Sequence, residues 1–316
     1  MLDPKRIRAD KNYVTKNLAR RGVKFNLNEV IQLDAQRRQL QSELDDLRGE
    51  KNRVSKEIGS AKIKADAISE SKSRMRELNK DLKNTEKELN KLSAQLNAFY
   101  LSIPNLLHDS VPDGNEESMN QEIRVWGEPR VFDFKAKDHV ELGQDLGLFD
   151  FETAAKISGS RFAVFKNDLA RLHRALIQFM IDIHTQENHY TEYYVPSLVK
   201  SSSLEGTGNL PKFKDDLFKI DSDDDFYLIP TAEVPLTNLV RDTILQTDEL
   251  PKKFIAHTPC YRSEAGSYGK DTRGMIRQHQ FEKVELVHIV KPEESYEALE
   301  ELTQNAESIL IKLGLP

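Results

Sequence analysis

Apolar residues recur every seven positions through the first third of the chain, a spacing typical of helices that pack along one another. The two series and their companion positions are Leu33, Leu40, Leu47, Val54 and Ala61 with Leu44 and Ile58, then Met75, Leu82, Leu89 and Leu96 with Leu78, Leu92 and Phe99. Arg37, Lys51 and Thr85 interrupt these seams. The spacing predicts two long amphipathic helices.

The connection between these helices is predicted from what interrupts the spacing. No proline lies between Pro4 and Pro104, so the backbone allows two long helices. The serine-rich stretch Ser69–Ser73 breaks the pattern and predicts the turn. We therefore expect an antiparallel two-helix coiled-coil arm, each helix about 50 Å long. The alternative is a coiled coil that only dimerises or tethers the protein.

A shorter amphipathic helix is predicted from Leu2 to Gly22, where the glycine ends it. Asn26 is followed three residues later by Glu29, which fits a capping box at the start of the first long helix. The candidate buried residues of the short helix are Ile7, Tyr13, Val14 and Leu18.

Residues from Pro104 to Asn115 include proline, asparagine and glycine, and they predict a linker between two domains, 1–104 and 105–316. The second domain mixes strand and helix patterns, which indicates an α+β fold. Its expected elements are a strand at Val125–Gly127, a helix at His139–Leu146, a strand at 162–165, a helix capped by Asn167 or Asp168, a strand at Tyr190–Val195 closed by Pro196, and a helix at Ser295–Leu313. The apolar stripe of the helix after Asn167 comprises Leu169, Leu172, Leu176, Ile177, Met180 and Ile183, so we expect it to be buried against the sheet or another subunit.

Two strands joined by a glycine-bearing loop are predicted between Phe254 and Val290. The first is expected to end in Cys260–Glu264 and the second to run from Met275 to Leu286. Side chains alternate between the two faces of a strand, so the residues expected on one face are Arg277, Phe281 and Glu285, with Arg262 and Glu264 sharing a face on the first strand. The opposite face, with Val284, Leu286 and Val290, is expected to face the core.

The predicted polar face combines guanidinium groups, an aromatic ring and carboxylates. Guanidinium groups bind anionic oxygens in two-pronged fashion, and a ring can stack on a planar base. This set therefore suits an anionic ligand that carries a base and an amine.

Charge is distributed unevenly over the 316 residues, whose formal net charge is −6. Residues 1–104 contain 23 Lys and Arg against 15 Asp and Glu, a balance of +8, and the remainder contains 23 against 37, a balance of −14. A basic arm on an acidic body favours an arm that meets a polyanion. A solvated, lysine-rich surface explains these counts equally well.

Composition excludes several classes of protein. A hydrophobic content of 38% suffices for a sizeable core, and no apolar run is long enough to span a bilayer. The N-terminus lacks the apolar segment of a secretion signal, and the single cysteine, Cys260, excludes an internal disulfide and a multi-cysteine metal site. We expect a soluble, cytoplasmic protein with no membrane partner.

Three short segments carry a resemblance to a known family. They are Thr231–Glu233, Tyr261–Gly266, and the later set Arg277, Phe281 and Glu285. Together they resemble seryl-tRNA synthetase, a class II aminoacyl-tRNA synthetase. The helical arm, the segment ending at Pro196 (similar to motif 1), the loop Gly206–Phe213 and the hairpin from Phe254 (similar to motif 2) occur in the family's order. The resemblance implies a tRNA-binding arm followed by a class II antiparallel-sheet catalytic domain.

The resemblance also implies that the region carrying motif 3 lies beyond Pro316, outside this sequence. In the family that region supplies an arginine for the γ-phosphate of ATP and an acidic ligand for the divalent ion, so no metal ligand is expected within this chain. Whether the sequence is a shortened form, and whether that form is active, stays open.

The implied reaction is activation of L-serine by ATP to seryl-adenylate, followed by transfer of serine to tRNA. Arg262 is the implied catalytic residue, which holds the α-phosphate and the substrate carboxylate. The implied ATP-binding residues are Arg262, Ser263, Glu264, Arg277, Gln278 and Phe281, with Phe281 stacked on adenine. The implied serine-binding residues are Thr231, Ala232, Glu233, Arg262 and Glu285.

Each role has a structural alternative. Arg262 could form a surface salt bridge with Glu264, Phe281 could be a core residue, and Thr231 could simply end a strand. Glu285 and Arg277 could be exposed charges of an edge strand. The cations Lys270, Arg273 and Lys283 are candidates for contacts with the acceptor end of tRNA, although solvation alone also explains them.

Cofactors and partners follow from the resemblance as well. Mg²⁺ is expected with ATP, and no zinc, because the histidines lack a ligand spacing and Cys260 has no partner thiol. The implied partners are L-serine, tRNA(Ser), with tRNA(Sec) as a second candidate, and a second copy that meets Asn167–Pro196 in a homodimer. Two other functions stay open: a non-catalytic tRNA-binding or dimerisation protein, and a carrier-protein aminoacylating ligase, against which the long arm argues.

Overall fold

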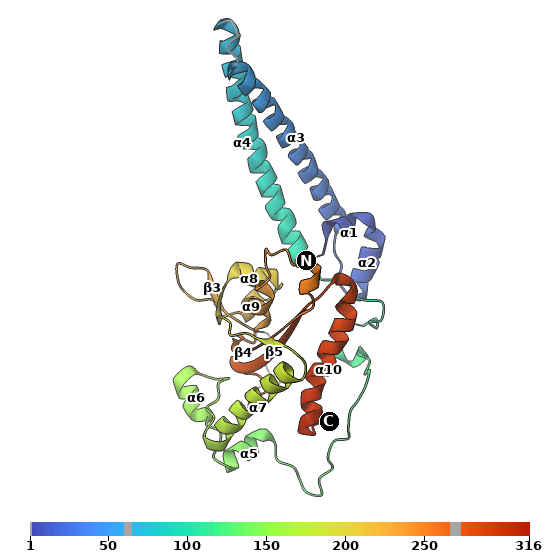
Figure 1. Cartoon of the computed structure of the whole chain (residues 1–316), viewed down its shortest axis with the longest axis vertical. Coiled ribbons are helices and arrows are strands. Elements are labelled where there is room, and N and C mark those ends of the chain that lie inside the picture. Colours follow the sequence, from blue (N-terminus) through green and yellow to red (C-terminus); the bar gives the residue numbers. More distant parts are fainter. Residues whose placement is uncertain (1, 60–64, 115, 266–272) are drawn as a thin grey trace. The chain divides into compact units, whose positions relative to one another are not determined.

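The computed structural model describes residues 2–59, 65–114, 116–265 and 273–316. Two compact units divide the chain, Met1–Glu122 and Ile123–Pro316 (Figure 1). The assignment of separate functions to residues 1–104 and 105–316 stays a prediction.

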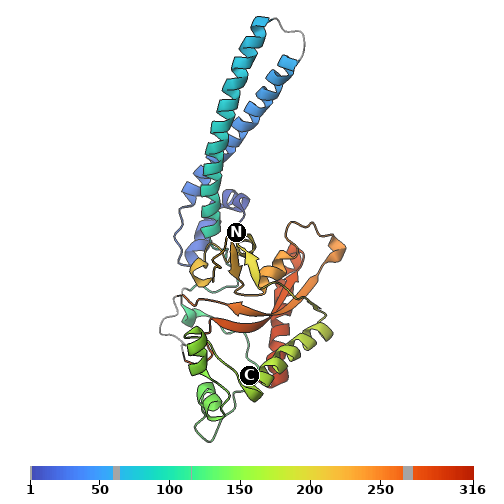
Figure 2. The same ribbon diagram turned by 90° about the vertical axis from the view of Figure 1, so that its left-hand side faces the viewer.

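The first unit is helical. Its helices are α1 (Pro4–Ala9), α2 (Lys11–Arg20), α3 (Leu27–Gly59) and α4 (Ala65–Ser102), followed by a 3₁₀ turn at Glu117–Met119. Helices α3 and α4 run side by side as a hairpin (Figures 1 and 2). Leu44, Leu82 and Leu89 are buried between them, so the spacing of seven correctly predicted the coiled-coil arm.

The predicted turn of the arm was misplaced. Ser69–Ser73 lies inside α4, and α3 ends at Gly59. Serine, glutamate and lysine disfavour a helix by only tenths of a kcal/mol per residue, whereas glycine disfavours it by about 1 kcal/mol. The predicted seam residue Ala61 lies outside the described residues.

The predicted N-terminal helix is two helices. Asp10 separates α1 from α2, and its side chain accepts a hydrogen bond from the backbone of Tyr13, which caps α2. Val14 and Leu18 are buried as predicted, whereas Tyr13 is 37% exposed. A short aspartate side chain favours an N-cap over a helix interior, which explains the break.

A buried carboxylate joins α1 to the base of the arm. The Asp34 side chain is 4% exposed and lies 2.7 Å from Arg8 Nη1 and 3.4 Å from both Arg37 and Arg38. A buried charge needs such partners, because its desolvation is otherwise costly.

The second unit contains two small sheets and six helices among the residues described between Ile123 and Pro316. Its helices are α5 (His139–Asp145), α6 (Phe151–Ser158), α7 (Asn167–Gln186), α8 (Ser201–Gly206), α9 (Glu233–Asn238) and α10 (Ser295–Leu313), with 3₁₀ turns at Lys214–Asp216, Thr247–Glu249 and Pro292–Glu294. Its strands are β1 (Thr191–Glu192), β2 (Leu198–Lys200), β3 (Phe226–Leu228), β4 (Lys252–Tyr261) and β5 (Gln280–Ile289).

The larger sheet has the order β1-β4-β5 and is mixed. Strand β1 pairs parallel to β4, and β4 pairs antiparallel to β5 along ten residues of each. Strands β2 and β3 form a separate antiparallel pair. The α+β class is confirmed, and the antiparallel β4–β5 pair is joined by β1 in parallel.

Several predicted boundaries in this unit were wrong. Val125–Gly127 forms no strand, residues 162–165 contribute only an isolated bridge from Phe165 to Phe149, and Tyr190–Val195 shortens to β1. Lys166, not Asn167 or Asp168, is the N-cap of α7. Short apolar runs look alike in strands and in extended segments, because only pairing distinguishes them.

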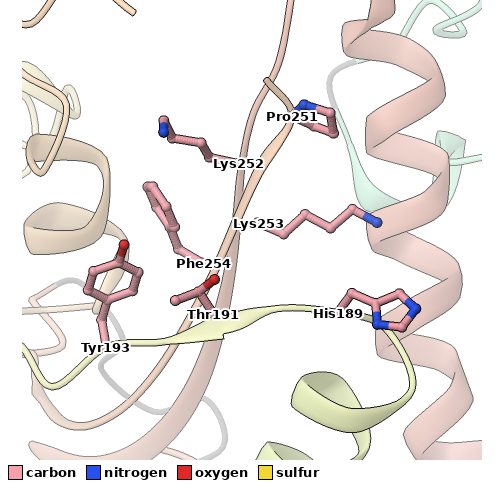
Figure 3. A pocket seen from close by; sticks show the side chains of 7 residues that line it. All are labelled: His189, Thr191, Tyr193, Pro251, Lys252, Lys253 and Phe254. Carbon is pink, nitrogen blue, oxygen red and sulfur yellow. The ribbon is translucent and has the colours of Figure 1, made fainter. Parts of the chain in front are cut away.

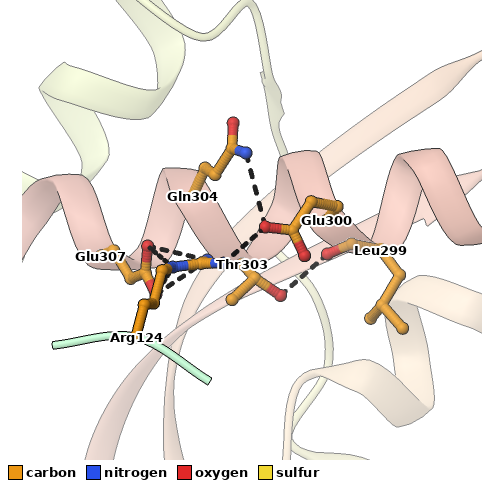
Figure 4. Close-up of polar contacts among 6 residues, drawn as sticks. All are labelled: Arg124, Leu299, Glu300, Thr303, Gln304 and Glu307. Carbon is orange, nitrogen blue, oxygen red and sulfur yellow. Dashed lines mark hydrogen bonds and ion pairs between the residues drawn. The ribbon is translucent and has the colours of Figure 1, made fainter. Parts of the chain in front are cut away.

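An arginine fork holds the extended segment before α5 to α10. Arg124 Nη1 lies 2.7 Å from Glu300 Oε1, and Arg124 Nε donates to Glu307 Oε1 at 3.0 Å (Figure 4). The segment at Val125–Gly127 is therefore tied by side chains where strand pairing was predicted.

The apolar stripe of α7 is less buried than predicted. Ile183 is buried, but Leu172 is 53% exposed and the other predicted members are half-buried. Helix α7 contacts β4 and β5, and a three-stranded sheet covers only part of so wide a stripe.

A buried polar cluster connects the sheet to α10 and predicts the response of this unit to acid. The Tyr190 hydroxyl lies 2.6 Å from His288 Nε2 and accepts from Asn305 Nδ2 at 3.0 Å. Burial lowers the pKa of His288 and, on α7, the pKa of His184. The folded state therefore keeps both rings neutral where the unfolded chain, with histidine pKa values of about 6.5, begins to bind protons.

As pH falls below that unfolded value, the free energy of unfolding should decrease, by at most about 1.4 kcal/mol per histidine per pH unit. Calorimetry at pH 7.5 and pH 5.5 should show a lower melting temperature of this unit at pH 5.5. The variant His288→Gln should reduce that difference, whereas His189→Asn should leave it unchanged, since His189 is exposed and its φ of 58° suits asparagine. An equal pH response in wild type and His288→Gln would contradict the assignment.

Candidate active site

The register of β4 and β5 places a row of functional side chains on one sheet face. Cys260 pairs with Phe281, Thr258 with Lys283, and Ala256 with Glu285. Directly paired residues share a face, so Phe281, Lys283 and Glu285 lie together on it. Their three partners on β4 are buried, and they themselves are half-buried.

The same face continues into the core. Phe254 and Val287 lie farther along it and pack with Ala232 and Leu236 of the α9 region. Val284, Leu286 and Val290, which were expected to face the core, are half-buried like the residues of β5 on the other face, and Leu286 pairs with the fully buried Ile255. Helix α9 lies on one side of the strands and α7 on the other (Figure 1), so both faces are covered. The polar residues lie beside the apolar cluster on the face that α9 covers.

An arginine and an aromatic ring meet at one end of this face. The guanidinium carbon of Arg262 lies 5.2 Å from the centroid of the Phe281 ring. Arg262 Nε donates to the carbonyl oxygen of Pro230 at 3.3 Å, which fixes the orientation of the side chain. A cation held over an aromatic face leaves its remaining N–H groups available to an anion.

Arg277 reaches the same region by a different route from the predicted one. Strand β5 begins at Gln280, so strand alternation does not place Arg277 with Phe281. Arg277 Nη1 instead donates to Glu264 Oε2 at 2.9 Å within the segment that connects β4 to β5. Glu264 has a φ of 53°, a backbone conformation that is uncommon outside glycine and asparagine.

The residues that flank Arg262 are anchored to the 3₁₀ turn at Lys214–Asp216. Ser263 N donates to Asp216 O at 3.0 Å, Ser263 Oγ donates to Asp215 O at 2.5 Å, and Ala265 N donates to Asp216 Oδ1 at 3.0 Å. Gln278 is also fixed, because its buried amide donates to Gly274 O at 2.7 Å. Ser263 and Gln278 thus support the backbone around the arginine.

The other end of the face holds a compact polar cluster. Thr231 Oγ1 donates to Glu285 Oε2 and accepts from Lys283 Nζ at 2.9 Å and from the backbone of Glu233 at 3.1 Å. Lys283 Nζ also lies 2.5 Å from Glu285 Oε2. Thr231 and Ala232 are buried at the start of α9, whose first residue is Glu233.

The electrostatics of this cluster favour a cation. Burial raises the pKa of Glu233, the negative charge of Glu285 raises it further, and Lys283 lowers it. A second positive charge at this site would stabilise the Glu233 carboxylate as an anion. Nearby, burial raises the pKa of the Cys260 thiol, which argues against a thiolate nucleophile.

No carboxylate or histidine cluster suitable for a metal ion occurs among the described residues. A pocket near the first residues of β4 is lined by His189, Thr191, Tyr193, Pro251, Lys252, Lys253 and Phe254 (Figure 3). Lys253 points away from it to Glu301 on α10. This pocket is therefore lined neither by the Phe281 ring nor by the carboxylates of Glu233 and Glu285.

Comparisons with known proteins match both units. The family model described as the seryl-tRNA synthetase N-terminal domain matches residues 1–107, and that of the tRNA synthetase class II core domain (G, H, P, S and T) matches residues 216–316. A serine–tRNA ligase of Saccharophagus degradans is 52% identical over the whole chain and 74% of its own length, and one of Dechloromonas aromatica is 54% identical over the same shares. The chain belongs to the seryl-tRNA synthetase family.

Solved structures agree with this assignment. Seryl-tRNA synthetase of Pyrococcus horikoshii, in complex with ATP, is 36% identical with a TM-score of 0.86 over 99% of this chain and 75% of that one. Serine–tRNA ligase of Naegleria fowleri, in complex with AMP, is 26% identical with a TM-score of 0.78 over 95% and 69%. The resemblance inferred from the sequence is confirmed, and neither alternative function is favoured.

As a seryl-tRNA synthetase, the chain gathers the residues expected for its two substrates at two ends of one face. Arg262, Glu264, Arg277 and Phe281 lie at one end, and Thr231, Ala232, Glu233 and Glu285 lie at the other. Glu264 pairs with Arg277, so the suggested salt bridge with Arg262 is not the pairing observed.

The cations expected at the tRNA acceptor end differ in position. Arg273 pairs with Asp138 at 3.1 Å, and Lys270 lies outside the described residues. Lys283 lies inside the polar cluster of this synthetase, where sequence reasoning did not place it. Strand alternation offered the signal, since position 283 shares its face with 281 and 285.

Proposed function

We propose that the chain activates L-serine with ATP and transfers it to tRNA. A serine carboxylate oxygen attacks the α-phosphorus, the bond to the β-phosphate breaks, and pyrophosphate leaves. The terminal ribose hydroxyl of tRNA then attacks the carbonyl carbon of seryl-adenylate, and AMP leaves. The observation that carries this proposal is the single sheet face with Arg262 over Phe281 at one end and Thr231, Lys283 and Glu285 at the other.

At the nucleotide end, adenine stacks on Phe281 and the Arg262 guanidinium contacts the α-phosphate and the serine carboxylate. Its catalytic contribution is to neutralise the charge that shifts between these two groups during the displacement. Glu264 and Arg277 bind at the base and phosphates, and Ser263 and Gln278 complete the nucleotide site as supports of the backbone. Their existing hydrogen bonds to Asp215 and Gly274 support that positioning role.

At the amino-acid end, Glu233 and Glu285 accept hydrogen bonds from the ammonium and hydroxyl groups of serine, beside Thr231 and Ala232. A site built to hydrogen-bond a hydroxyl discriminates strongly against an analogue that lacks it, because its own polar groups would stay unpaired. Alanine should therefore be rejected on polarity, and threonine on size.

Mg²⁺ is proposed to enter with ATP. The described residues do not supply a carboxylate cluster for it, so no step is assigned to the ion.

The coiled-coil arm is proposed to bind tRNA(Ser), with tRNA(Sec) as a second candidate, through shape and phosphate contacts. The proposal also includes a homodimer that meets through Asn167–Pro196 and a location in the cytoplasm. No helix among the described residues is long and apolar enough to cross a membrane.

The proposal is tested by exchange of labelled pyrophosphate into ATP. Exchange should require serine, with alanine and threonine as matched controls, and the pH-stable sulfamoyl analogue of seryl-adenylate should raise the melting temperature. Exchange that is equal with and without serine, together with no stabilisation by the analogue, would exclude serine activation by this site.

A further inference from the structure

Lys283 occupies the place in the amino-acid pocket that a substrate ammonium group should take. Its Nζ lies 2.5 Å from Glu285 Oε2 and 2.9 Å from Thr231 Oγ1. We propose that Lys283 is a resident cation of the serine pocket, displaced from Glu285 by the ammonium group of serine and then free to pair with the serine carboxylate. The inference rests on the proposed function and adds a residue that determines which amines the pocket accepts.

The position of Lys283 along β5 supports this role. Residues 281, 283 and 285 lie on one face, and each step of two residues spans about 7 Å. Phe281 is proposed to hold adenine and Glu285 to hold serine. The ammonium group of Lys283 between them is therefore next to the bond that forms between the serine carboxylate and the α-phosphorus. A lysine side chain is a flexible point charge, which suits a move from one anion to its neighbour.

The formal charges of the pocket balance only when Lys283 is counted. With serine bound, the anions are Glu233, Glu285 and the serine carboxylate, and the cations are Arg262, Lys283 and the serine ammonium. Without Lys283 this half-buried site would carry an uncompensated negative charge, which is unfavourable in a medium of low dielectric constant. In the free protein the same lysine keeps Glu285 paired.

The ion pair is also exposed enough to exchange. The side chain of Lys283 is 32% exposed and that of Glu285 is 19% exposed. Because the Lys283 side chain keeps access to water, its ammonium group can be hydrated when the ammonium group of serine takes its place beside Glu285. Lys283 also favours the charged form of Glu233, because it lowers the pKa of Glu233, which burial and Glu285 raise.

The test compares two ligands in three variants. Serine carries ammonium and carboxylate groups, whereas serinol (2-amino-1,3-propanediol) carries the ammonium group and a hydroxymethyl group in place of the carboxylate. Titration calorimetry gives the ratio of their dissociation constants in wild type, Lys283→Met and Lys283→Arg. The control is Lys252→Met, which removes a lysine of similar exposure from the same hairpin, where it pairs with Glu249.

In Lys283→Met, serinol should bind as tightly as in wild type or more tightly, because the competing cation is gone. Serine should bind more weakly, because its carboxylate has lost a partner. The preference for serine over serinol should fall about 10- to 100-fold, the size of a charge-assisted hydrogen bond. Lys283→Arg should restore part of the preference, and Lys252→Met should leave it unchanged.

Other outcomes overturn the inference in distinguishable ways. An unchanged preference in Lys283→Met with normal serine binding would exclude the resident cation, and a loss confined to tRNA charging would assign Lys283 to the tRNA instead. Equal weakening of both ligands with a lower melting temperature would assign it a structural role. A wild type that binds neither ligand and shows no exchange would remove the proposed function and this inference with it.

Discussion

Replacing Arg262 with alanine should lower serine-dependent pyrophosphate exchange about 10²- to 10³-fold, the loss expected when one preorganised donor to a developing charge is removed. The guanidinium group is held over Phe281 and tied to Pro230 before any substrate arrives. Its interaction should strengthen as charge moves onto the α-phosphate, so kcat should fall more than the KM for ATP rises.

A second variant distinguishes the effect of the paired guanidinium donors from the effect of the positive charge, and a third serves as a control. Arg262→Lys keeps a cation but lacks the planar pair of donors, so it should recover only part of the lost rate. Arg241→Ala removes an exposed arginine of the same unit and serves as the control. Exchange by Arg262→Ala within a factor of about two of wild type would refute the catalytic role.

Deleting residues 36–95 and joining the ends by a short Gly-Ser linker should leave pyrophosphate exchange near its wild-type rate and lower serylation of tRNA about a hundredfold or more. The deleted hairpin contributes its own seam of Leu44, Leu82 and Leu89, and the proposed catalytic and substrate-binding residues all lie in the second unit. A loss of roughly 3 kcal/mol of tRNA binding corresponds to that factor.

The measurement compares exchange and tRNA charging in the same preparations at two salt concentrations. The matched control keeps the arm but changes the exposed cations Lys80, Lys83 and Lys87 to glutamine. It should weaken charging less than the deletion does and make it less dependent on salt, because fewer phosphate contacts release fewer counterions. Equal loss of exchange and charging on deletion would contradict this division of labour.

Sequence patterns predicted the elements whose signal is local and periodic. The spacing of seven identified both arm helices, and the alternation along β5 placed Phe281 and Glu285 on one face. The turn of the arm was misplaced because a serine-rich stretch looks like a breaker, although helix continuation through Ser69–Ser73 is inexpensive.

Features that depend on tertiary contacts could not be predicted from the sequence. The approach of Arg277 to Glu264 depends on where pairing of β5 starts, and the core side of the sheet depends on where α9 packs. Lys283 was considered a candidate for tRNA contacts because it was treated as one more exposed cation, whereas one of its two partners, Thr231, lies about fifty residues earlier in the chain. Family resemblance supplied the candidate site residues, and only the three-dimensional arrangement showed that Lys283 lies beside Thr231.

The bonds from Ser263 and Ala265 to the turn at Asp215 and Asp216 have a consequence for substrate choice. They immobilise the backbone on the C-terminal side of Arg262 during folding, so little orientational entropy is lost when a nucleotide arrives. The same stiffness limits how far the backbone beside the arginine can follow a phosphate displaced by about 1 Å. A misaligned nucleotide or a bulkier amino acid would thus be discriminated against by the immobility of the arginine itself, without any residue that touches the difference.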